Sequence, residues 1–485
     1  MTRAIVALGG LAAILAMPIA ASGQGYTADV SLNAGMVELR GLRRDSLPES
    51  QVTGEGQQRQ LEDGTVVTCI PDEFCRWFPS GDVESVSIVT EDLRFAYWPG
   101  IEGLAAQAHV RARYGSDDFW PRSEQEIEAL YAFVSYEDTD YRVRAGRQQR
   151  TNGLGYYNFD GASFLWRGFD PVRFDVYGGW SLARNLNAPR TGSLLEDADE
   201  FAPDDQGWIL GIEVQGRIGS FATGAFTYQR EIRDDRLALY TERIAGDVGI
   251  RVSRVSVDLA LDYDLAFEEF NEASIRVSTP VVAGVEAMAQ QRRYTPYFEL
   301  WTIWGAFSPV GFDETRGWLA WSSSGGEVRL EAGGAYRTYE DTDAGAQFVD
   351  LEDDGWRGFG RAHWTRDGWF ADVSYLAEEG SGAALYGGDL SLGRDFGPGR
   401  YVSLQATSSQ NFSEYRLGEQ VTAGGGIDAA WRLGDVWLTG GWAMYGLSYK
   451  EQPRVSDWDQ QRGRVGISYH FGTEPETPDR IGVRP

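Results

Sequence analysis

Basic side chains other than arginine are almost absent from this sequence of 485 residues. It has one lysine, Lys450, and three histidines, whereas Asp and Glu together number 72, so the formal net charge is −28. Binding to nucleic acid requires a basic surface, and the sequence therefore predicts no nucleic-acid partner. Metal sites are built from clustered Cys, His and carboxylate ligands, and with two cysteines and three histidines we expect neither a metal site nor a cofactor.

Long apolar runs are also missing beyond the N-terminal segment. After residue 25 no stretch approaches the ~18 consecutive apolar residues of a transmembrane helix, and the sustained apolar periodicity of core helices is nearly absent. In their place are 60 Gly, 17 Trp, 23 Tyr and 23 Phe, with only five Met. Glycine and aromatic residues, with a mean hydropathy of −0.36, are typical of a large β-barrel with a wet interior and aromatic rings at both membrane interfaces.

The first residues resemble a secretory signal peptide. Arg3 gives a positive start, residues 4–16 are apolar, and small residues at 20–23 follow Pro18 as a cleavage site. We expect residues 1–23 to be removed and the mature chain to begin near Gln24. The alternative is a retained anchor, which the short apolar run does not favour.

Segments with alternating apolar and polar residues recur every twenty or so residues. Short turns rich in Gly, Pro and Asp alternate with long polar connections, as between the two ends of a membrane barrel. We count 22 strands, or 20 or 18 if one or two hairpins are misread. The predicted strands are 27–39, 84–97, 104–114, 126–136, 141–150, 161–167, 172–180, 208–218, 221–231, 240–252, 254–267, 271–279, 281–292, 315–323, 327–339, 356–365, 369–377, 383–394, 401–410, 421–433, 436–449 and 460–471.

The last strand carries the clearest alternation. Val465, Ile467, Tyr469 and Phe471 share one face, and polar or small residues occupy the other. This near-terminal strand resembles the closing-strand signal of Gram-negative outer-membrane β-barrels, carried here by Tyr469 and Phe471. The polar, proline-containing tail at 472–485 is expected to be disordered in the periplasm.

Charged residues share one face of several predicted strands. Asp258, Asp262 and Asp264 alternate with apolar residues in 254–267, and Arg357 and Arg361 share a face in 356–365. A charge facing lipid at mid-depth costs several kcal/mol, so these five side chains are predicted to line the pore.

A second pore-lining group is predicted in 141–150. Arg142, Arg144, Gln148 and Arg150 share one face there, and guanidinium groups on a lumen wall could bind carboxylates or phosphates. The alternative is that these arginines pair with neighbouring Asp and Glu. The tripeptide GRQ, followed shortly by FDG, resembles a pattern of large outer-membrane channels, including the alginate-export family, over residues 146–167. The resemblance implies a channel-like barrel.

Two loops carry further predictions. The connection 297–309 is the least polar of the long ones, and we expect it to fold into the lumen as a constriction lined by Glu299, Trp301 and Trp304. Alternatively, it extends two tall strands and its tryptophans join the outer aromatic belt. In the connection 42–83, Cys69 and Cys75 are expected to form a local disulfide that staples a loop tip.

No catalytic motif is recognisable. A serine hydrolase needs a Ser–His pair with an orienting partner, and none of His109, His363 and His470 lies in such a motif. The sequence therefore predicts no enzyme.

Together these features predict one transmembrane antiparallel β-barrel over residues 24–471, in the outer membrane of a diderm bacterium. We expect a porin-like channel for small polar or charged solutes, with mild preference for cations because of the acidic net charge, although the arginine wall opposes it. Expected partners are outer-membrane lipid, lipopolysaccharide and the barrel-assembly machinery; the oligomeric state is left open. The alternatives are a blocked structural or ligand-binding barrel and, third, an outer-membrane hydrolase.

Overall fold

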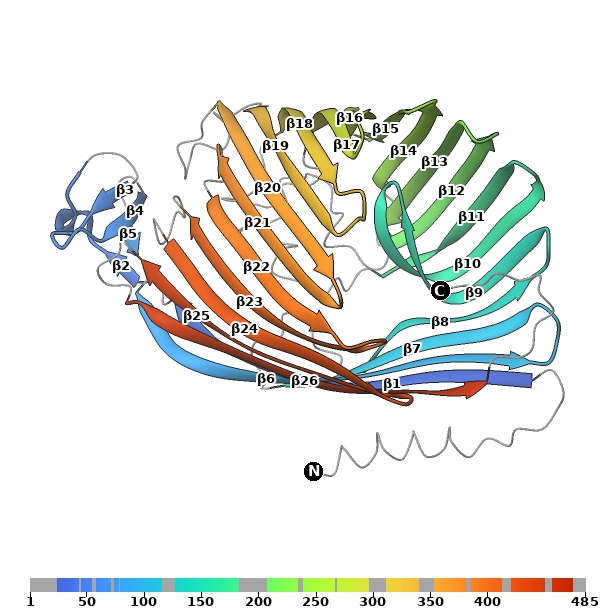
Figure 1. Ribbon diagram of the computed structural model, residues 1–485, viewed down its shortest axis with the longest axis horizontal. Coiled ribbons are helices and arrows are strands. Elements are labelled where there is room, and N and C mark those ends of the chain that lie inside the picture. The colour runs from blue at the N-terminus through green and yellow to red at the C-terminus, as the bar shows by residue number, and fades with distance from the viewer. Residues whose placement is uncertain are drawn as a thin grey trace.

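The computed structural model (Figure 1) is built almost entirely from β-strands. It describes residues 24–42, 45–54, 58–70, 74–77, 79–115, 127–182, 207–233, 239–266, 268–295, 311–339, 353–380, 385–411, 420–449 and 456–473. Among these residues no helix is long and apolar enough to cross a membrane.

Twenty-two antiparallel strands form one sheet, and each of the predicted strands overlaps one of them. The strands are β1 (Gln24–Leu42), β6 (Ser80–Pro99), β7 (Leu104–Gly115), β8 (Ile127–Glu137), β9 (Tyr141–Asn152), β10 (Gly155–Phe169), β11 (Val172–Ser181), β12 (Gly207–Ile218), β13 (Ala222–Arg233), β14 (Leu239–Val252), β15 (Val255–Asp264), β16 (Glu269–Val282), β17 (Val285–Tyr294), β18 (Phe312–Ser322), β19 (Val328–Tyr339), β20 (Asp354–Arg366), β21 (Trp369–Glu379), β22 (Leu385–Asp395), β23 (Arg400–Asn411), β24 (Gln420–Leu433), β25 (Val436–Tyr449) and β26 (Trp458–Thr473).

The sheet is closed by its first and last strands. Each strand pairs with the next along the chain, and β1 pairs with β6 on one side and with β26 on the other. The β1–β26 pairing runs from Tyr26 opposite Thr473 to Val37 opposite Arg462. The prediction of a closed antiparallel barrel, with 22 as the best count, is therefore confirmed.

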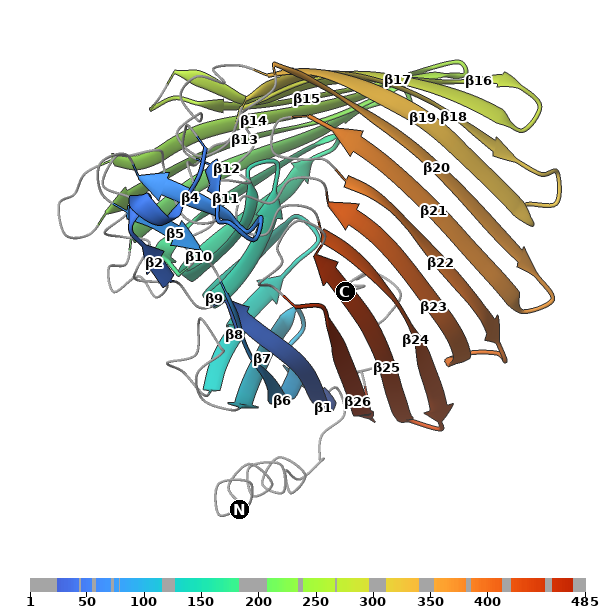
Figure 2. The ribbon, with the colours of Figure 1, turned by 90° about the vertical axis from the view of Figure 1, so that its left-hand side faces the viewer.

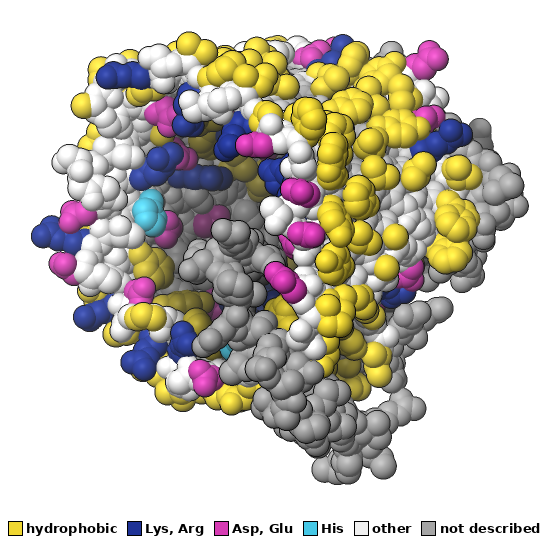
Figure 3. Space-filling model, turned by 90° about the vertical axis from the view of Figure 1, so that its right-hand side faces the viewer, with side chains coloured by type: hydrophobic (Ala, Val, Ile, Leu, Met, Phe, Trp, Pro, Cys, Tyr) yellow, Lys and Arg dark blue, Asp and Glu magenta, His cyan; other side chains and the backbone are white. Residues whose placement is uncertain are grey.

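The two faces of the sheet differ in polarity. In β15, Val255, Leu259 and Leu261 point outward and are exposed, whereas Asp258 and Asp262 alternate with them on the inner face. Figure 3 shows hydrophobic side chains over the outer wall and charged side chains around the hollow at one end of the barrel. An apolar exterior around a polar interior is the pattern of a sheet with lipid outside and water inside.

The two ends of the barrel also differ. At one end, here called the turn end, two-residue turns such as Val252 to Val255 and Leu433 to Val436 join the strands. The other end, the loop end, carries the long connections 183–206, 296–310 and 340–352, which lie outside the described residues. Glu299, Trp301 and Trp304 fall in the second of these, so their predicted role in a constriction stays a prediction.

A small second sheet stands at the loop end. It consists of β2 (Asp45–Leu47), β3 (Gln58–Gln60), β4 (Val66–Ile70) and β5 (Phe74–Trp77), in the order β2-β5-β4-β3, with a short 3₁₀ turn at Glu49–Gln51. Figures 1 and 2 show it beyond the loop ends of β1 and β6, the two barrel strands that it connects.

The small sheet has its own apolar core. Leu61, Val67, Cys69 and Cys75 are buried in it, and Cys69 and Cys75 lie opposite each other on β4 and β5 and form the disulfide. The sequence predicts 42–83 as a polar connection with a stapled tip. That was wrong for the strands, because elements of three to five residues are too short to show an alternating pattern.

We predict that the small sheet can be removed without loss of the barrel. The backbone pairings of β2–β5 are internal to their sheet, and the β1–β6 ladder continues, with a shift of register after Arg40, to Leu42 opposite Ser80. Replacing residues 45–77 by a short Gly-Ser linker should leave refolding into lipid vesicles and the heat-dependent gel shift of a folded barrel unchanged. A variant that no longer shifts would contradict this independence.

Candidate functional site

The hairpin of β9 and β10 bends into the barrel. Its turn at the loop end consists of Gly153 and Leu154, and the tip lies against the inner face of β14, four strands away along the sheet. A Cβ added to Gly153 would lie 2.9 Å from the Cβ of Ala245 in β14. Figure 1 shows this hairpin, in teal, arching away from β9 and β10 toward β14. The hairpin therefore takes up part of the lumen near the loop end.

Apolar side chains hold the hairpin against the wall. Leu154, Tyr157 and Phe159 of the hairpin pack with inner-face residues of β11, β12 and β14, and all members of the cluster are at most 4% exposed. Fully burying such a side chain stabilises a fold by ~1.5–3 kcal/mol. The wall residues of this cluster are Tyr177, Ile209 and Ala245.

Polar groups within the cluster are hydrogen-bonded. The Tyr177 hydroxyl donates to Gln229 Oε1 at 2.6 Å and accepts from Asn152 Nδ2 at 3.1 Å, and the Tyr157 hydroxyl donates to the Leu154 carbonyl oxygen at 2.9 Å. Buried polar groups without partners would be costly, so these contacts allow two tyrosines to lie inside the cluster.

Arg243 of β14 fixes the tip of the hairpin. Its guanidinium forms an ion pair with Asp262 of β15, and its Nη1 lies 3.4 Å from both the Leu154 carbonyl oxygen and the Tyr157 hydroxyl. A planar guanidinium presents donors in a fixed fork, so one side chain can bridge a carboxylate and the hairpin.

The GRQ and FDG tripeptides lie directly opposite each other on β9 and β10. In this register Arg147 pairs with Asp160, and two hydrogen bonds of 2.8 Å join the guanidinium to the carboxylate. Both side chains point to the outer face. Asp160 is opposite Trp180, which is opposite Trp208 on the next strand, so the pair lies at the level of aromatic rings typical of a membrane interface.

The two glycines of these tripeptides allow close strand contact. Gly146 has φ +124°, and a Cβ there would overlap the carbonyl oxygen of Ala132. A Cβ on Gly161 would overlap the carbonyl oxygen of Gly178. Glycine is therefore required at both positions, which come just before the part of the hairpin that bends into the barrel.

The nine residues predicted to line the pore lie on the inner face of the sheet, but they differ in their surroundings. Gln148 and Asp264 are 4% and 1% exposed and do not border open space. Asp262 is the partner of Arg243. The inner-face residues are Arg142, Arg144, Gln148, Arg150, Asp258, Asp262, Asp264, Arg357 and Arg361.

Two of these five arginines, Arg150 and Arg357, pair with carboxylates. Arg150 lies 2.9 Å from Asp175 and 2.8 Å from Glu213, and its guanidinium stacks on Tyr177 at 4.2 Å from the ring centroid. In the same way, ion pairs join Arg357 to Glu378 at 2.7 Å and Asp258 to Arg276 at 3.0 Å.

Three of the predicted guanidiniums lack such partners. Among the described residues, Arg142, Arg144 and Arg361 form no ion pair within 4.0 Å, and Arg144 lies over the ring of Phe133 at 4.8 Å. β9 and β20 are eleven strands apart in a ring of 22 strands, so Arg142 and Arg144 face the wall that carries Arg361.

Each histidine pairs with an aspartate on the adjacent strand. The distances are 2.7 Å for His109 to Asp92, 2.5 Å for His363 to Asp372 and 2.6 Å for His470 to Asp29. These pairs lie on separate parts of the inner face.

The His363 pair does not form a serine triad. In a triad the histidine lies between the serine and the carboxylate. Here Ser391 is opposite Asp372, so Asp372 lies between the serine and His363. Within the described residues, no group of three or more His, Cys, Asp or Glu could hold a metal ion.

The inward hairpin was not predicted from the sequence. The predicted strand 161–167 begins six residues after the observed start of β10 at Gly155. A change of polarity along the inner face is the sequence signal for this hairpin. The face is polar at Arg142, Arg144 and Arg150 of β9. It becomes apolar at Leu154, Tyr157 and Phe159.

Comparisons with known proteins show a likeness of fold only. No protein-family model and no curated protein matches the chain. Among solved structures, Pseudomonas aeruginosa OccK8 (OprE) is 10% identical with TM-score 0.38, covering 93% of this chain and 98% of that one. A BenF-like porin from Pseudomonas fluorescens Pf-5 is 9% identical with TM-score 0.38 over 92% and 99%, and the siderophore receptor PirA from P. aeruginosa is 11% identical with TM-score 0.48 over 94% and 81%. At these values the likeness identifies neither a family nor a function.

We predict that Gly161→Ala destabilises the barrel. Its Cβ would overlap backbone atoms of Gly178 and Gly179, which cannot move as a flexible side chain can. Overpacking of this kind lowers the free energy of unfolding by roughly 1–3 kcal/mol. Urea unfolding in lipid vesicles measures this loss. Gly463→Ala is the matched control, because nothing lies within 4 Å of its added Cβ, and equal stability of the two variants would contradict the close packing at Gly161.

Proposed function

We propose that this protein is a porin-like channel in the outer membrane of a diderm bacterium and that it lets small polar or charged solutes pass passively. The observation that carries the proposal is the closed 22-stranded sheet with an apolar outer face and a charged inner face. In barrels of this size, side chains alone do not fill the lumen. The solute would be selected by the width and the charge of the passage, without a cofactor.

The orientation follows from the two ends. Short turns face the periplasm and long loops face the outside in bacterial barrels. In this orientation the turn end is periplasmic and the small sheet stands at the cell surface. The disordered tail predicted at 472–485 begins too early, because Gly472 and Thr473 belong to β26 and pair with β1. Cleavage after residue 23, the closing-strand role of Tyr469 and Phe471 in barrel assembly, and contacts with lipopolysaccharide remain predictions. Both aromatic residues lie on β26, where they pair with Val30 and Ala28 of β1.

The inward hairpin is the proposed narrow part of the passage. It covers the inner face from β11 to β14, and its polar edge carries Arg150 with Asp175 and Glu213. Below it, toward the turn end, a recess of about 1020 Å³ borders Arg173, Asp247 and Asp258. A solute passing the hairpin would therefore enter a wider, charged space.

Ion preference depends on two opposing features. The acidic net charge of −28 favours cations near the entrance. The unpaired guanidiniums of Arg142, Arg144 and Arg361 favour anions inside the lumen. We propose that the channel has a mild net preference for cations, which would weaken as salt screens the surface charge.

The runner-up is a barrel whose lumen is blocked, with a structural or binding role. The inward hairpin is the specific feature in its favour, because it shows that the chain folds back into its own lumen. The resemblance to alginate exporters supports a channel-like barrel, and we propose no solute from it. A hydrolase is not proposed, since on the described strands Asp372 lies between Ser391 and His363, which is not the order of a triad.

Shortening the hairpin is predicted to widen the passage. Replacing residues 152–155 by the turn Asn-Gly closes the hairpin on the Thr151–Tyr156 pair and removes Leu154. Proteoliposomes with this variant should swell several-fold faster in polyethylene glycols near the size limit of the unchanged protein. The barrel without residues 45–77 serves as control and should keep the original limit. An unchanged limit in the hairpin variant would argue against the hairpin as the narrow part.

The unpaired arginines of β9 are predicted to oppose cations. Replacing both Arg142 and Arg144 by Gln should shift the reversal potential in a salt gradient toward greater cation preference. The outward-facing Arg230→Gln is the control and should leave the potential unchanged. If the double variant behaves like the control, ions do not pass near these side chains.

A further inference from the structure

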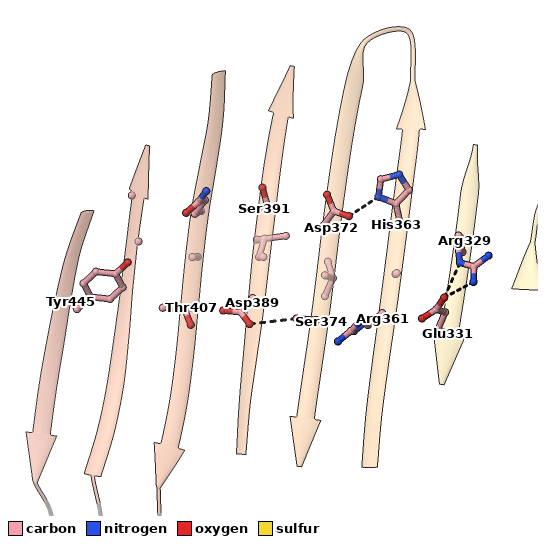
Figure 4. A pocket seen from close by; sticks show the side chains of 17 residues that line it. Arg329, Glu331, Arg361, His363, Asp372, Ser374, Asp389, Ser391, Thr407 and Tyr445 are labelled. Carbon is pink, nitrogen blue, oxygen red and sulfur yellow. Dashed lines mark hydrogen bonds and ion pairs between the residues drawn. The ribbon is translucent and has the colours of Figure 1, made fainter. Parts of the chain in front are cut away.

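A second recess lies on the wall made by β19 to β25. Its volume is about 590 Å³, which lies within the range of ~300–1,000 Å³ typical of small-molecule sites. Figure 4 shows its side chains on successive strands, with Tyr445 at one edge and Arg329 and Glu331 at the other. The recess is distinct from the larger one below the hairpin.

Four hydrogen-bonding side chains at its centre, here called the grid, lie on two neighbouring strands. Asp389 is opposite Thr407, and Ser391 is opposite Gln405, on strands β22 and β23. Partners across two strands lie ~5 Å apart, and residues i and i+2 on one strand lie ~7 Å apart. The four groups therefore present donors and acceptors over the span of one small molecule.

The hydrogen-bonding capacity of this grid is largely unused. Among the described residues, the side chains of Ser391, Gln405 and Thr407 have no hydrogen-bond partner, and Asp389 accepts only a long bond of 3.4 Å from Ser374. Two hydroxyls and one amide can both donate and accept, and the carboxylate accepts, so together they match the hydroxyl groups of a solute.

Glycines beside the grid let atoms of β25 come close to β24. On β24, Gly424 and Gly426 continue the rows of Thr407 and Gln405. The Tyr445 ring occupies the place of a Cβ at Gly424, and the Arg462 guanidinium stacks on that ring at 5.0 Å. Tyr445 therefore bounds the recess as a fixed edge.

Side chains of both charge signs lie around the grid. Asp372 is paired with His363, and the guanidinium of Arg361 lies on the same wall as the carboxylate of Asp389. An anion would meet Asp389, and a cation would meet Arg361. A neutral solute avoids both repulsions and can use all four groups of the grid.

We infer that this recess binds a neutral polyhydroxylated solute, a sugar or polyol, through Asp389, Ser391, Gln405 and Thr407. The inference deepens the proposed channel function and rests on it, because the recess lies in the lumen. Such a site would raise the concentration of a sugar inside the channel and favour its passage over that of a non-binding solute of equal size.

Equilibrium binding of maltose tests this inference. The full chain, refolded in detergent micelles, is titrated calorimetrically with maltose. The double variant S391A with Q405A removes a hydroxyl and an amide from the grid and should weaken binding at least about tenfold, which is ~1.4 kcal/mol. The matched control S274A with Q290A removes the same groups from the larger recess and should bind within twofold of the unchanged protein.

Three results would overturn the inference: no heat of maltose binding to the folded barrel, equal weakening in grid variant and control, or tighter binding of glucuronate that is lost in R361Q. The first two exclude a sugar site in this recess, and the third assigns it to an anion. The channel proposal is judged separately by vesicle swelling. Swelling without maltose binding rejects only the sugar site, whereas maltose binding without swelling supports the site and rejects the channel.

Discussion

The pairing of β1 with β26 is the constraint on which the rest of the structure depends. A sheet surrounded by lipid cannot leave backbone groups unpaired at an edge, because the hydrocarbon offers no hydrogen-bond partner. The ladder from Tyr26 to Val37 against residues 462–473 removes that edge. Once the sheet is closed, each strand has one face toward lipid and one toward the interior. The alternation of Leu259 and Leu261 with Asp258 and Asp262 follows from this closure.

The interior enclosed by the 22 strands has two kinds of inner surface, one apolar and one polar. Where the β9–β10 hairpin covers the wall, the inner face is apolar and buried, as at Tyr177 and Ile209. Where nothing described covers it, the inner face carries polar side chains such as Asp389 and Gln405. Arg243 joins the two regions, since it pairs with a wall carboxylate and contacts the hairpin tip. The interior is therefore narrowed on one side by a fixed element and remains polar elsewhere.

The barrel was predictable from the sequence because its signal is local. Each strand shows its own alternation, and the short turns mark one end, so all 22 strands could be found separately. Contacts between distant strands have no such signal. Nothing local places Gly153 against Ala245, and the partners of Arg150 on β11 and β12 depend on register and side-chain direction. The small sheet escaped detection because its strands have three to five residues.

The disulfide and the tripeptides show which features can be predicted from residues that are close in the sequence. Two cysteines six residues apart predicted the Cys69–Cys75 bond, but the sheet around it was not foreseen. The resemblance carried by GRQ and FDG implied a channel-like barrel. The register shows that Arg147 and Asp160 form a pair on the outer face, whereas Gln148 points inward and is buried. The alternation placed Gln148 on the inner face, and the pairing of β9 with β10 identifies Asp160 as the partner of Arg147.

The most direct test of the central claim, an open and water-filled lumen, is the single-channel conductance of the refolded protein in a planar bilayer. The account predicts stable ohmic steps whose size rises with salt concentration, since ions would move through water between charged walls. A correctly folded barrel that inserts into the bilayer but stays electrically silent would contradict it and would favour a lumen blocked by the chain itself.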